Sequence, residues 1–183
     1  MPYILFALIP LLLIALWVVA AYNGFVTLRN LKDEAFATMD VYLKKRYDLI
    51  PNLVETVKGY AAHEKETFEK VIQARNMAMG AQDLETRQQG ESMLTGTLKS
   101  LFALAENYPD LKANASFLDL QNQLQKLEED IAQSRKYYNA VVKDYNTKTE
   151  LFPSSIVAGI FGFIKAPYFE IESGERENVQ VSF

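Results

Sequence analysis

The amino-terminal stretch constrains this chain more than any other feature of its sequence. No charged side chain precedes Arg29, and the run from Pro2 to Tyr22 is almost wholly apolar. As an α-helix rising about 1.5 Å per residue, this run would be roughly 32 Å long, enough to cross a hydrocarbon core about 30 Å thick. We therefore predict a transmembrane anchor over residues 1–23, with the rest of the chain lying beside a membrane.

A cleaved signal peptide is the alternative for this segment. Signal peptides begin with basic residues, continue with about 7–15 apolar residues and end at a small-x-small cleavage site. Here Met1 alone precedes a longer apolar run, and Val19-Ala20-Ala21 is a poor cleavage site. Tyr3, Trp17 and Tyr22 suit the aromatic belts found at both membrane surfaces. The pattern favours an anchor that is not removed.

The charges that follow the apolar run predict its orientation. Basic residues near the end of a span tend to stay in the cytoplasm, whereas acidic residues count for little. The sequence therefore predicts a single-pass protein of the cell membrane, with its N-terminus outside and its C-terminal body in the cytoplasm. The basic residues after the span are Arg29, Lys32, Lys44, Lys45 and Arg46.

Composition excludes several classes of protein. The net charge of −4 and the absence of a basic stripe with interleaved aromatic residues argue against a nucleic-acid partner. The chain has no cysteine, which excludes disulfides and thiol chemistry. The part after the apolar run is long enough to bury a hydrophobic core.

A long apolar stripe follows the predicted anchor. Its residues recur at steps of three and four, a period near 3.5 that is typical of a packed helix. Because the phase continues across Pro51 as far as Arg75, we predict one long helix kinked at Pro51. The alternative is a break at Asp48, whose carboxylate could cap a new helix. The stripe consists of Leu28, Leu31, Ala35, Met39, Tyr42, Ile50, Leu53 or Val54, Val57, Ala61, Phe68 and Val71.

Two more helices complete the predicted body. One runs from about Leu84 to Asn107 and is weakened by two glycines, Gly90 and Gly96. The next carries an apolar stripe from Phe117 to Tyr145 over four heptads, which needs a partner surface to be stable. We predict an all-α fold, in which a transmembrane helix continues into a long kinked helix packed in an antiparallel three- to four-helix bundle over residues 24–150.

The last part of the chain begins with a compact apolar segment. Residues 151–165 predict a short helix capped by Ser154 or Ser155, too short to span a bilayer. It either closes one end of the bundle, lies in the membrane interface, or joins a neighbouring subunit. The tail over residues 166–183 predicts an extended or partly disordered segment.

Three groups of polar residues are candidates for functional sites. The basic run Lys44–Arg46 could bind lipid phosphates, but Lys44 would lie roughly 33 Å beyond the span, farther than a Debye length of about 8 Å. We instead expect Arg46 or Lys45 to pair with acidic residues of the third helix or of another copy. His63 lies beside Glu64, Glu66 and Glu69, but a helical His-Glu-x-x-His zinc site would need a second histidine at position 67, which is Thr67. We therefore predict a solvated or helix-terminal cluster there.

The Tyr-Asn pairs at 22–23, 138–139 and 145–146 form the third group. A buried tyrosine ring with a bonded hydroxyl, and an asparagine in a helical seam, fix the register of helices. We predict that these pairs specify packing rather than recognise a ligand. The sequence thus predicts no catalytic, cofactor-binding or metal site and no enzymatic activity.

Several motifs together resemble the LemA family. The resemblance covers nearly the whole chain in the expected order, although Phe36 and Tyr42 stand where Trp and Gln would be expected. It implies one N-terminal membrane helix and an antiparallel helical body, without a defined reaction. The matching segments are Tyr22-Asn23, Leu28-Arg29-Asn30, Val41 to Ala61 with His63-Glu64, Ala74-Arg75, Tyr108 to Asn114, Ile131-Ala132 with Arg135, Tyr138-Asn139, Tyr145-Asn146 and Phe161-Gly162-Phe163.

The sequence therefore favours a non-enzymatic membrane protein that self-assembles or scaffolds through helical surfaces. A tether to the bilayer raises the effective concentration of copies and turns weak contacts into oligomers. We expect the lipid bilayer and a second copy of the chain as partners. The alternative is an accessory or adaptor subunit of a membrane protease or stress-response complex, which would require a membrane-protein partner.

Overall fold

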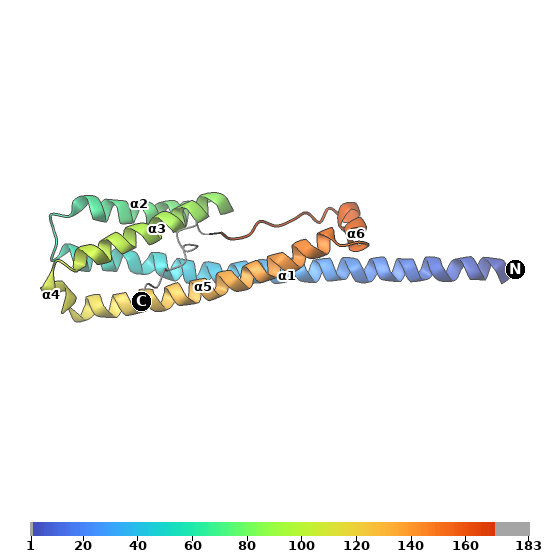
Figure 1. The fold of residues 1–183 in the computed structure, drawn as a ribbon, viewed down its shortest axis with the longest axis horizontal. Coiled ribbons are helices and arrows are strands. Elements are labelled where there is room, and N and C mark those ends of the chain that lie inside the picture. Colours follow the sequence, from blue (N-terminus) through green and yellow to red (C-terminus); the bar gives the residue numbers. More distant parts are fainter. Residues whose placement is uncertain (1, 171–183) are drawn as a thin grey trace, which may run out of the picture. The chain divides into compact units, whose positions relative to one another are not determined.

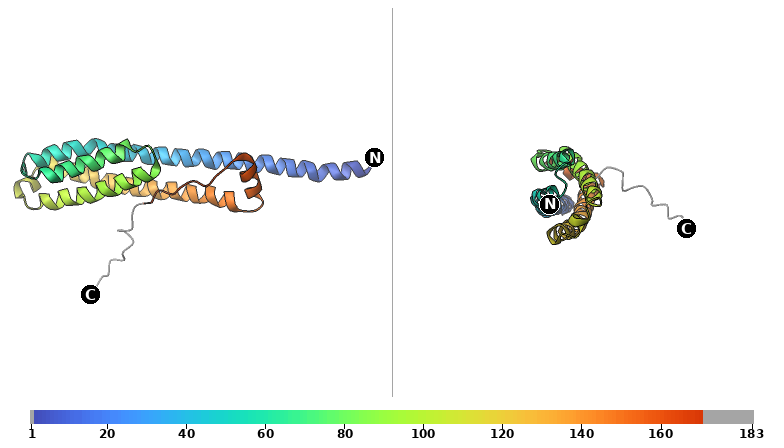
Figure 2. Two further views of the ribbon diagram at one scale, coloured as in Figure 1. Left: turned by 90° about the horizontal axis from the view of Figure 1, so that it is seen from above. Right: turned by 90° about the vertical axis from the view of Figure 1, so that its left-hand side faces the viewer.

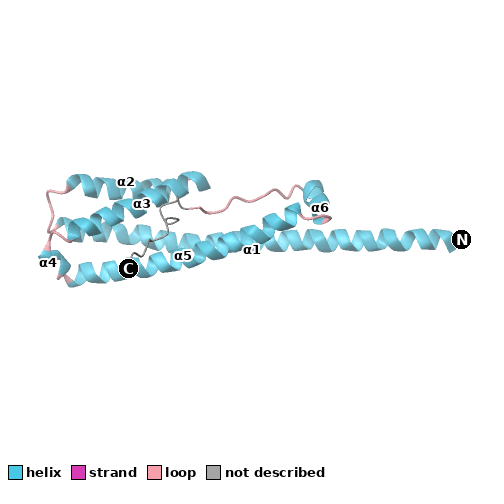
Figure 3. Cartoon of the chain, in the orientation of Figure 1, coloured by secondary structure: helices cyan, strands magenta, loops and turns pink. Residues whose placement is uncertain are grey.

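The structure is a computed structural model that describes residues 2–170, with side chains from residue 8 onward. Within residues 2–170 all of the regular secondary structure is helical, as Figure 3 shows. The predicted all-α class is therefore confirmed. The elements are α1 (Pro2–Lys58), α2 (Lys65–Gly80), α3 (Leu84–Ala105), α4 (Pro109–Lys112), α5 (Ala115–Glu150) and α6 (Ser154–Phe161), drawn in chain order in Figure 1.

By their contacts these elements form two units, which we call the first and the second unit. Among the described residues, the first unit comprises residues 2–39 and Gln133–Tyr168, and the second comprises Asp40–Ala132 with Phe169 and Glu170. Helices α1 and α5 each contribute one segment to either unit. The predicted domain boundaries, at residues 23, 150 and 165, stay predictions.

The second unit is an antiparallel arrangement of four helical segments. The C-terminal part of α1, the helices α2 and α3, and the N-terminal part of α5 lie side by side in both views of Figure 2. Leucine, isoleucine and valine side chains at helical spacing fill the space between them, because each helix has one apolar face to bury. The largest fully buried apolar side chains of this unit, among the described residues, are Phe169, Leu43, Ile50, Leu53, Val57, Leu94, Leu101 and Leu111.

The first unit has its own core, built around aromatic rings. Ala21 and Phe25 of α1 pack with Tyr145 of α5 and with Val157 of α6. The ring of Phe25 stacks on that of Phe163, with centroids 4.7 Å apart, directly after α6 ends. Gly162 ends that helix in the left-handed conformation, at φ 72°, which a residue without Cβ adopts at little cost.

The predicted helix from Leu28 to Arg75 is wrong in one respect. Helix α1 runs through Pro51 without a break at Asp48, but it ends at Lys58, and α2 begins only at Lys65. The chain turns at Gly59, a poor helix former, and the amides of Tyr60 and Ala61 both donate to the carbonyl oxygen of Val57 as α1 closes. The stripe therefore belongs to two helices rather than one.

The remaining elements agree closely with the predicted ones, except that neither serine caps α6: its N-cap is Pro153, and the hydroxyl of Ser154 donates to the carbonyl oxygens of Lys148 and Leu151. The second predicted helix is α3, whose first turn is capped by Asp83, the acceptor of a 2.8 Å hydrogen bond from the amide of Thr86. The third is α5, capped by Asn114, which accepts from the amide of Phe117 at 3.0 Å. Residues 162–170, after α6, contain no helix, and the predicted tail from residue 171 onward lies outside the described residues.

Candidate functional site

A cluster of four polar side chains lies inside the second unit. Arg46 of α1 is 2% exposed and Glu91 of α3 only 1%. One nitrogen of the Arg46 guanidinium donates to Glu91, and another donates to Glu128 of α5 at 2.6 Å. The hydroxyl of Tyr47 donates to the second oxygen of Glu91. We call Arg46, Tyr47, Glu91 and Glu128 the Arg46 cluster.

The Arg46 cluster confirms one prediction and extends it. Arg46 pairs with an acidic residue of the third predicted helix, as expected from the basic run, and that residue is Glu128. The more deeply buried partner, Glu91, was not predicted. Its signal in the sequence is its position three residues before Leu94, in phase with the apolar stripe of α3. A carboxylate at such a position is buried and needs a cationic partner.

The electrostatics of the cluster suit a permanent structural link. Burial raises the pKa of Tyr47, although the positive charges of Arg46 and Arg87 act in the opposite direction. Tyr47 therefore stays a neutral hydrogen-bond donor to the Glu91 carboxylate. Because Arg46 and Glu91 are almost completely shielded from solvent, neither is open to a substrate. The cluster joins α1, α3 and α5 through charged hydrogen bonds.

A second polar contact supplies a hydrogen-bond donor to a backbone carbonyl oxygen of α1. Proline has no amide hydrogen, so Pro51 cannot donate to the carbonyl oxygen of Tyr47, its usual partner four residues earlier. The Nε atom of Arg75, from α2, donates to that carbonyl oxygen at 2.7 Å. A side chain of α2 thus takes the place of the missing backbone donor. This contact allows α1 to continue through a proline while it holds α2 against it.

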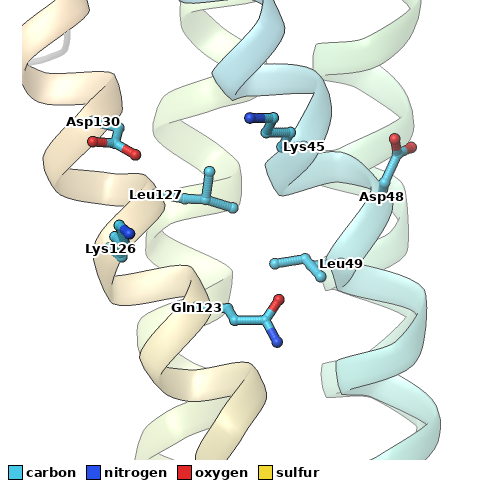
Figure 4. A pocket seen from close by; sticks show the side chains of 7 residues that line it. All are labelled: Lys45, Asp48, Leu49, Gln123, Lys126, Leu127 and Asp130. Atoms are coloured by element: carbon cyan, nitrogen blue, oxygen red, sulfur yellow. The ribbon is translucent and has the colours of Figure 1, made fainter.

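Among the grooves that the described residues of the second unit form, two have volumes of several hundred cubic ångströms. The first, of about 430 Å³, is lined by Lys45, Asp48 and Leu49 of α1 and by Gln123, Lys126, Leu127 and Asp130 of α5. Figure 4 shows Leu49 and Leu127 pointing toward each other across it. Its charges are of both signs, so it has no preference for a small anion or cation.

The second groove lies between α1 and α2 and is larger, about 700 Å³. Val54, Phe68 and Ile72 provide apolar surface, whereas Glu55, Lys58, Lys65 and Glu69 contribute charges of both signs. Apolar surface bordered by mixed charge is typical of a groove that receives an amphipathic helix. We call it the α1–α2 groove.

The other candidate residues from the sequence, His63, Lys44 and Lys45, lie on the surface. His63 is exposed in the turn between α1 and α2. Among the side chains that the structure describes, no group of three or more His, Asp or Glu is placed to hold a metal ion. Lys44 and Lys45 are exposed, and Lys45 lies over the ring of Tyr42, with its ammonium 5.4 Å from the ring centroid.

The Tyr-Asn pairs hold a segment rather than only a helical seam. Asn146 makes two hydrogen bonds with Ala166: its amide donates to the carbonyl oxygen at 2.9 Å, and its oxygen accepts from the backbone amide at 2.8 Å. The hydroxyl of Tyr138 donates to the carbonyl oxygen of Pro167 at 3.1 Å. Burial raises the pKa of Tyr138 and that of Tyr145. These side chains fasten the segment after α6 to α5.

One helix within the described residues qualifies as a membrane span by length and composition. It is the part of α1 from Leu8 to Lys58, and its apolar window has a mean hydropathy of 2.1 with 11% of its residues buried. Large apolar side chains from Leu8 to Val19 are exposed. From Ala21 onward the same helix buries side chains at regular intervals.

Comparison with known proteins gives one family and several relatives. The LemA family matches residues 35–183. The chain is 26% identical over 175 residues to the magnetosome proteins MamQ 2 and MamQ 1 of Paramagnetospirillum magneticum, which covers 81% of this chain and 64% of each relative. It is 24% identical over 185 residues to protein LemA of Metamycoplasma hominis, covering 98% of this chain and 83% of that relative. The chain thus spans less than two thirds of the length of the magnetosome relatives.

Proposed function

Since this chain belongs to the LemA family, we propose that it is a membrane-anchored helical scaffold whose copies associate beside the bilayer. It performs no chemical reaction in this role. Helix α1 anchors it in the membrane, and the second unit provides the surface on which copies meet. The C-terminal body lies in the cytoplasm.

The change in exposure along α1 carries the proposal. The side chains of Leu11, Leu12, Leu13 and Ile14 are each more than 60% exposed, although nothing polar separates them. An uninterrupted apolar surface of this length is far too costly to leave in water, and a bilayer is the solvent that suits it. The helix continues from this surface into packed protein, which is the arrangement of an anchor with an attached body.

The α1–α2 groove supports association between copies. Val54, Phe68 and Ile72 form the apolar part of this groove, where Ile72 is partly exposed and the other two are nearly buried. Neighbouring charges of both signs favour one relative position of a bound helix over others. A partner helix of mixed charge would fit it, and α2 of a second copy, with Lys65 and Glu69 beside its own groove, carries such a face. Tethering to one plane raises the effective concentration of copies, so a weak contact suffices.

The polar clusters support a role without catalysis. Arg46 and Glu91 are engaged with each other and shielded from water, so their charges are not available to a substrate. Arg75 is engaged with a backbone carbonyl. The side chains of Arg46, Glu91 and Arg75 therefore join helices to one another.

Crosslinking in native membranes tests the proposal. Because the chain has no cysteine, single-cysteine variants report one position each. Glu69→Cys and Gln73→Cys place a thiol on α2 beside the groove, and Lys99→Cys places one on an exposed face of α3. With a short bis-maleimide we expect dimers from the two groove variants and little from the control at position 99.

Two results would argue against the scaffold. A monomer from every variant, together with a monomer by light scattering in detergent at all concentrations, would contradict self-association. A stoichiometric product with a different membrane protein would favour the alternative, an adaptor subunit of a membrane protease or stress-response complex. Release of the protein from membranes by buffer would contradict the anchor itself.

A further inference from the structure

Four apolar side chains form an exposed stripe along α6 and its flanks. Phe152, Ile156, Ile160 and Ile164 follow one another at steps of four residues, and they are 81%, 52%, 71% and 80% exposed. Isolated exposed apolar residues are common, but four large ones within one short segment mark a contact site. The stripe has no partner within the described residues of its own unit that covers it.

The opposite side of α6 is fixed to the helix that forms the predicted span. Val157 and Ala158 are buried against Ala21 and Phe25 of α1. The ring of Phe161 packs edge-on against Tyr22, with centroids 4.8 Å apart. Helix α6 is therefore attached to α1 at Ala21, Tyr22 and Phe25, directly after the exposed apolar side chains of α1 that end at Val19.

The segment that follows α6 is held in place from α5. Asn146 grips the backbone of Ala166 with two hydrogen bonds, and Tyr138 bonds to Pro167. The stripe is therefore held in position from two sides: α6 packs against α1, and the segment that follows α6 is hydrogen-bonded to α5. All of these contacts lie within the first unit.

Charges around the stripe are those that an anionic lipid surface attracts. Residues 151–169 contain no acidic side chain, and their one basic residue, Lys165, forms an ion pair with Glu150 at the end of α5. Arg29 lies over the ring of Phe163, its guanidinium carbon 5.8 Å from the ring centroid, and Lys148 lies over the ring of Phe25. An apolar face with basic residues at its edge is the pattern of a helix that lies in the membrane interface.

We propose that Phe152, Ile156, Ile160 and Ile164 insert into the interfacial layer of the bilayer that α1 spans. The occupant of the stripe is lipid: the acyl-chain boundary receives the four side chains, while Arg29, which is exposed beside the ring of Phe163, meets a lipid phosphate. This inference rests on the membrane anchoring in the proposed function. Its consequence is that α1 is fixed in rotation, because only one side of the helix carries α6.

Single-cysteine variants of the full chain in vesicles of phosphatidylcholine and phosphatidylglycerol test the insertion. Ile156→Cys reports the stripe, and Tyr137→Cys is its matched control, since Tyr137 is 51% exposed in the same unit. Leu12→Cys reports the span. We expect a membrane-impermeant maleimide to react about tenfold more slowly at position 156 than at position 137, a protection equivalent to about 1.4 kcal/mol. A fluorophore at position 156 should be quenched by lipids spin-labelled near the headgroup.

The outcomes separate this inference from the proposed function. Equal reaction at positions 156 and 137, with position 12 protected, overturns the insertion and leaves the anchor intact. Reaction at position 12 overturns the anchor and the insertion together. Protection at position 156 without quenching by labelled lipid, accompanied by a crosslink between two copies through that position, shows that protein covers the stripe and also overturns the insertion.

Discussion

At the scale of single residues, one contact joins a side chain to a backbone carbonyl oxygen that lacks its usual helical donor. Arg75 donates to the Tyr47 carbonyl oxygen that Pro51 leaves without its helical partner. Arg75→Met should therefore lower the free energy of unfolding by about 1–3 kcal/mol, since a half-buried carbonyl loses its donor. Thermal or urea unfolding of the protein in detergent, followed by circular dichroism, measures this cost.

A double-mutant cycle isolates the cause. Pro51→Ala restores a backbone amide that can bond to the Tyr47 carbonyl oxygen, so Arg75→Met should cost markedly less in that background. The same cost in both backgrounds would mean that Arg75 acts through packing alone. Lys70→Met is the control, because Lys70 pairs with Glu66 on the exposed surface of α2 and its loss should be nearly neutral.

The two carboxylates of the Arg46 cluster should differ sharply in their importance. Glu91→Ala leaves the Arg46 charge buried and should cost about 3–5 kcal/mol of unfolding free energy. Glu128 is 43% exposed, so solvent screens its pair with Arg46, and Glu128→Ala should cost about 1 kcal/mol or less. Replacing both buried partners, as in Arg46→Met with Glu91→Leu, should recover most of the stability lost in Glu91→Ala. Equal costs for the two single alanine variants would contradict this ranking.

Tyr47 gives the Arg46 cluster a pH dependence on the alkaline side. Its pKa is raised in the folded protein because burial disfavours the phenolate. The neutral hydroxyl therefore contributes stability that is complete below the unfolded pKa of about 10 and is lost as pH rises through the folded value. Tyr47→Phe should be less stable than the parent at neutral pH, but should lose less stability between neutral and strongly alkaline pH. If the free energies of unfolding of Tyr47→Phe and of the parent fall in parallel as pH rises over that range, Tyr47 is not the source of the pH dependence.

At the scale of helices, the close approach of α2 and α3 depends on one glycine. A Cβ at Gly90 would lie 2.6 Å from both the backbone nitrogen and the Cα of Ala78, whereas at Gly96 it would meet nothing within 4 Å. Gly90→Ala should therefore separate the two helices and cost about 1–3 kcal/mol of unfolding free energy. Gly96→Ala, in the same helix, should stabilise the protein by about 0.5–1 kcal/mol. Destabilisation by both changes would show that the contact is not responsible.

The sequence pattern predicted which residues are buried better than where the chain turns. Val57, Ala61, Phe68 and Val71 are all buried, as their phase indicated, yet α1 ends among them at Lys58. A helix that folds back after a turn of suitable length keeps its apolar residues in register, so periodicity alone cannot show the turn. The one local signal was Gly59, which had no proline or strong cap beside it.

The candidate contacts were predictable only in part, for a similar reason. The pairing of Arg46 with α5 followed from charge and from the expected packing of two amphipathic helices. The role of Arg75 did not, because its acceptor is a main-chain atom whose availability depends on Pro51 in another helix. The bonds from Asn146 to Ala166 likewise join a helix to a segment with no periodicity of its own. Contacts to the backbone leave no pattern in side-chain spacing.

At the scale of the whole molecule, the basic residues that follow the apolar run predict on which side of the membrane the body lies. Arg29 and Lys32 follow the apolar run directly, so we expect Tyr137→Cys to be unreactive toward an impermeant maleimide in intact cells and reactive once the membrane is opened. Changing Arg29 and Lys32 to Gln, together with lysines added after Met1, should make a fraction of the position-137 thiols reactive from outside. The same added lysines with Arg29 and Lys32 retained should expose a smaller fraction. Reactivity in intact cells without any charge change would place the body outside the cytoplasm and contradict the orientation.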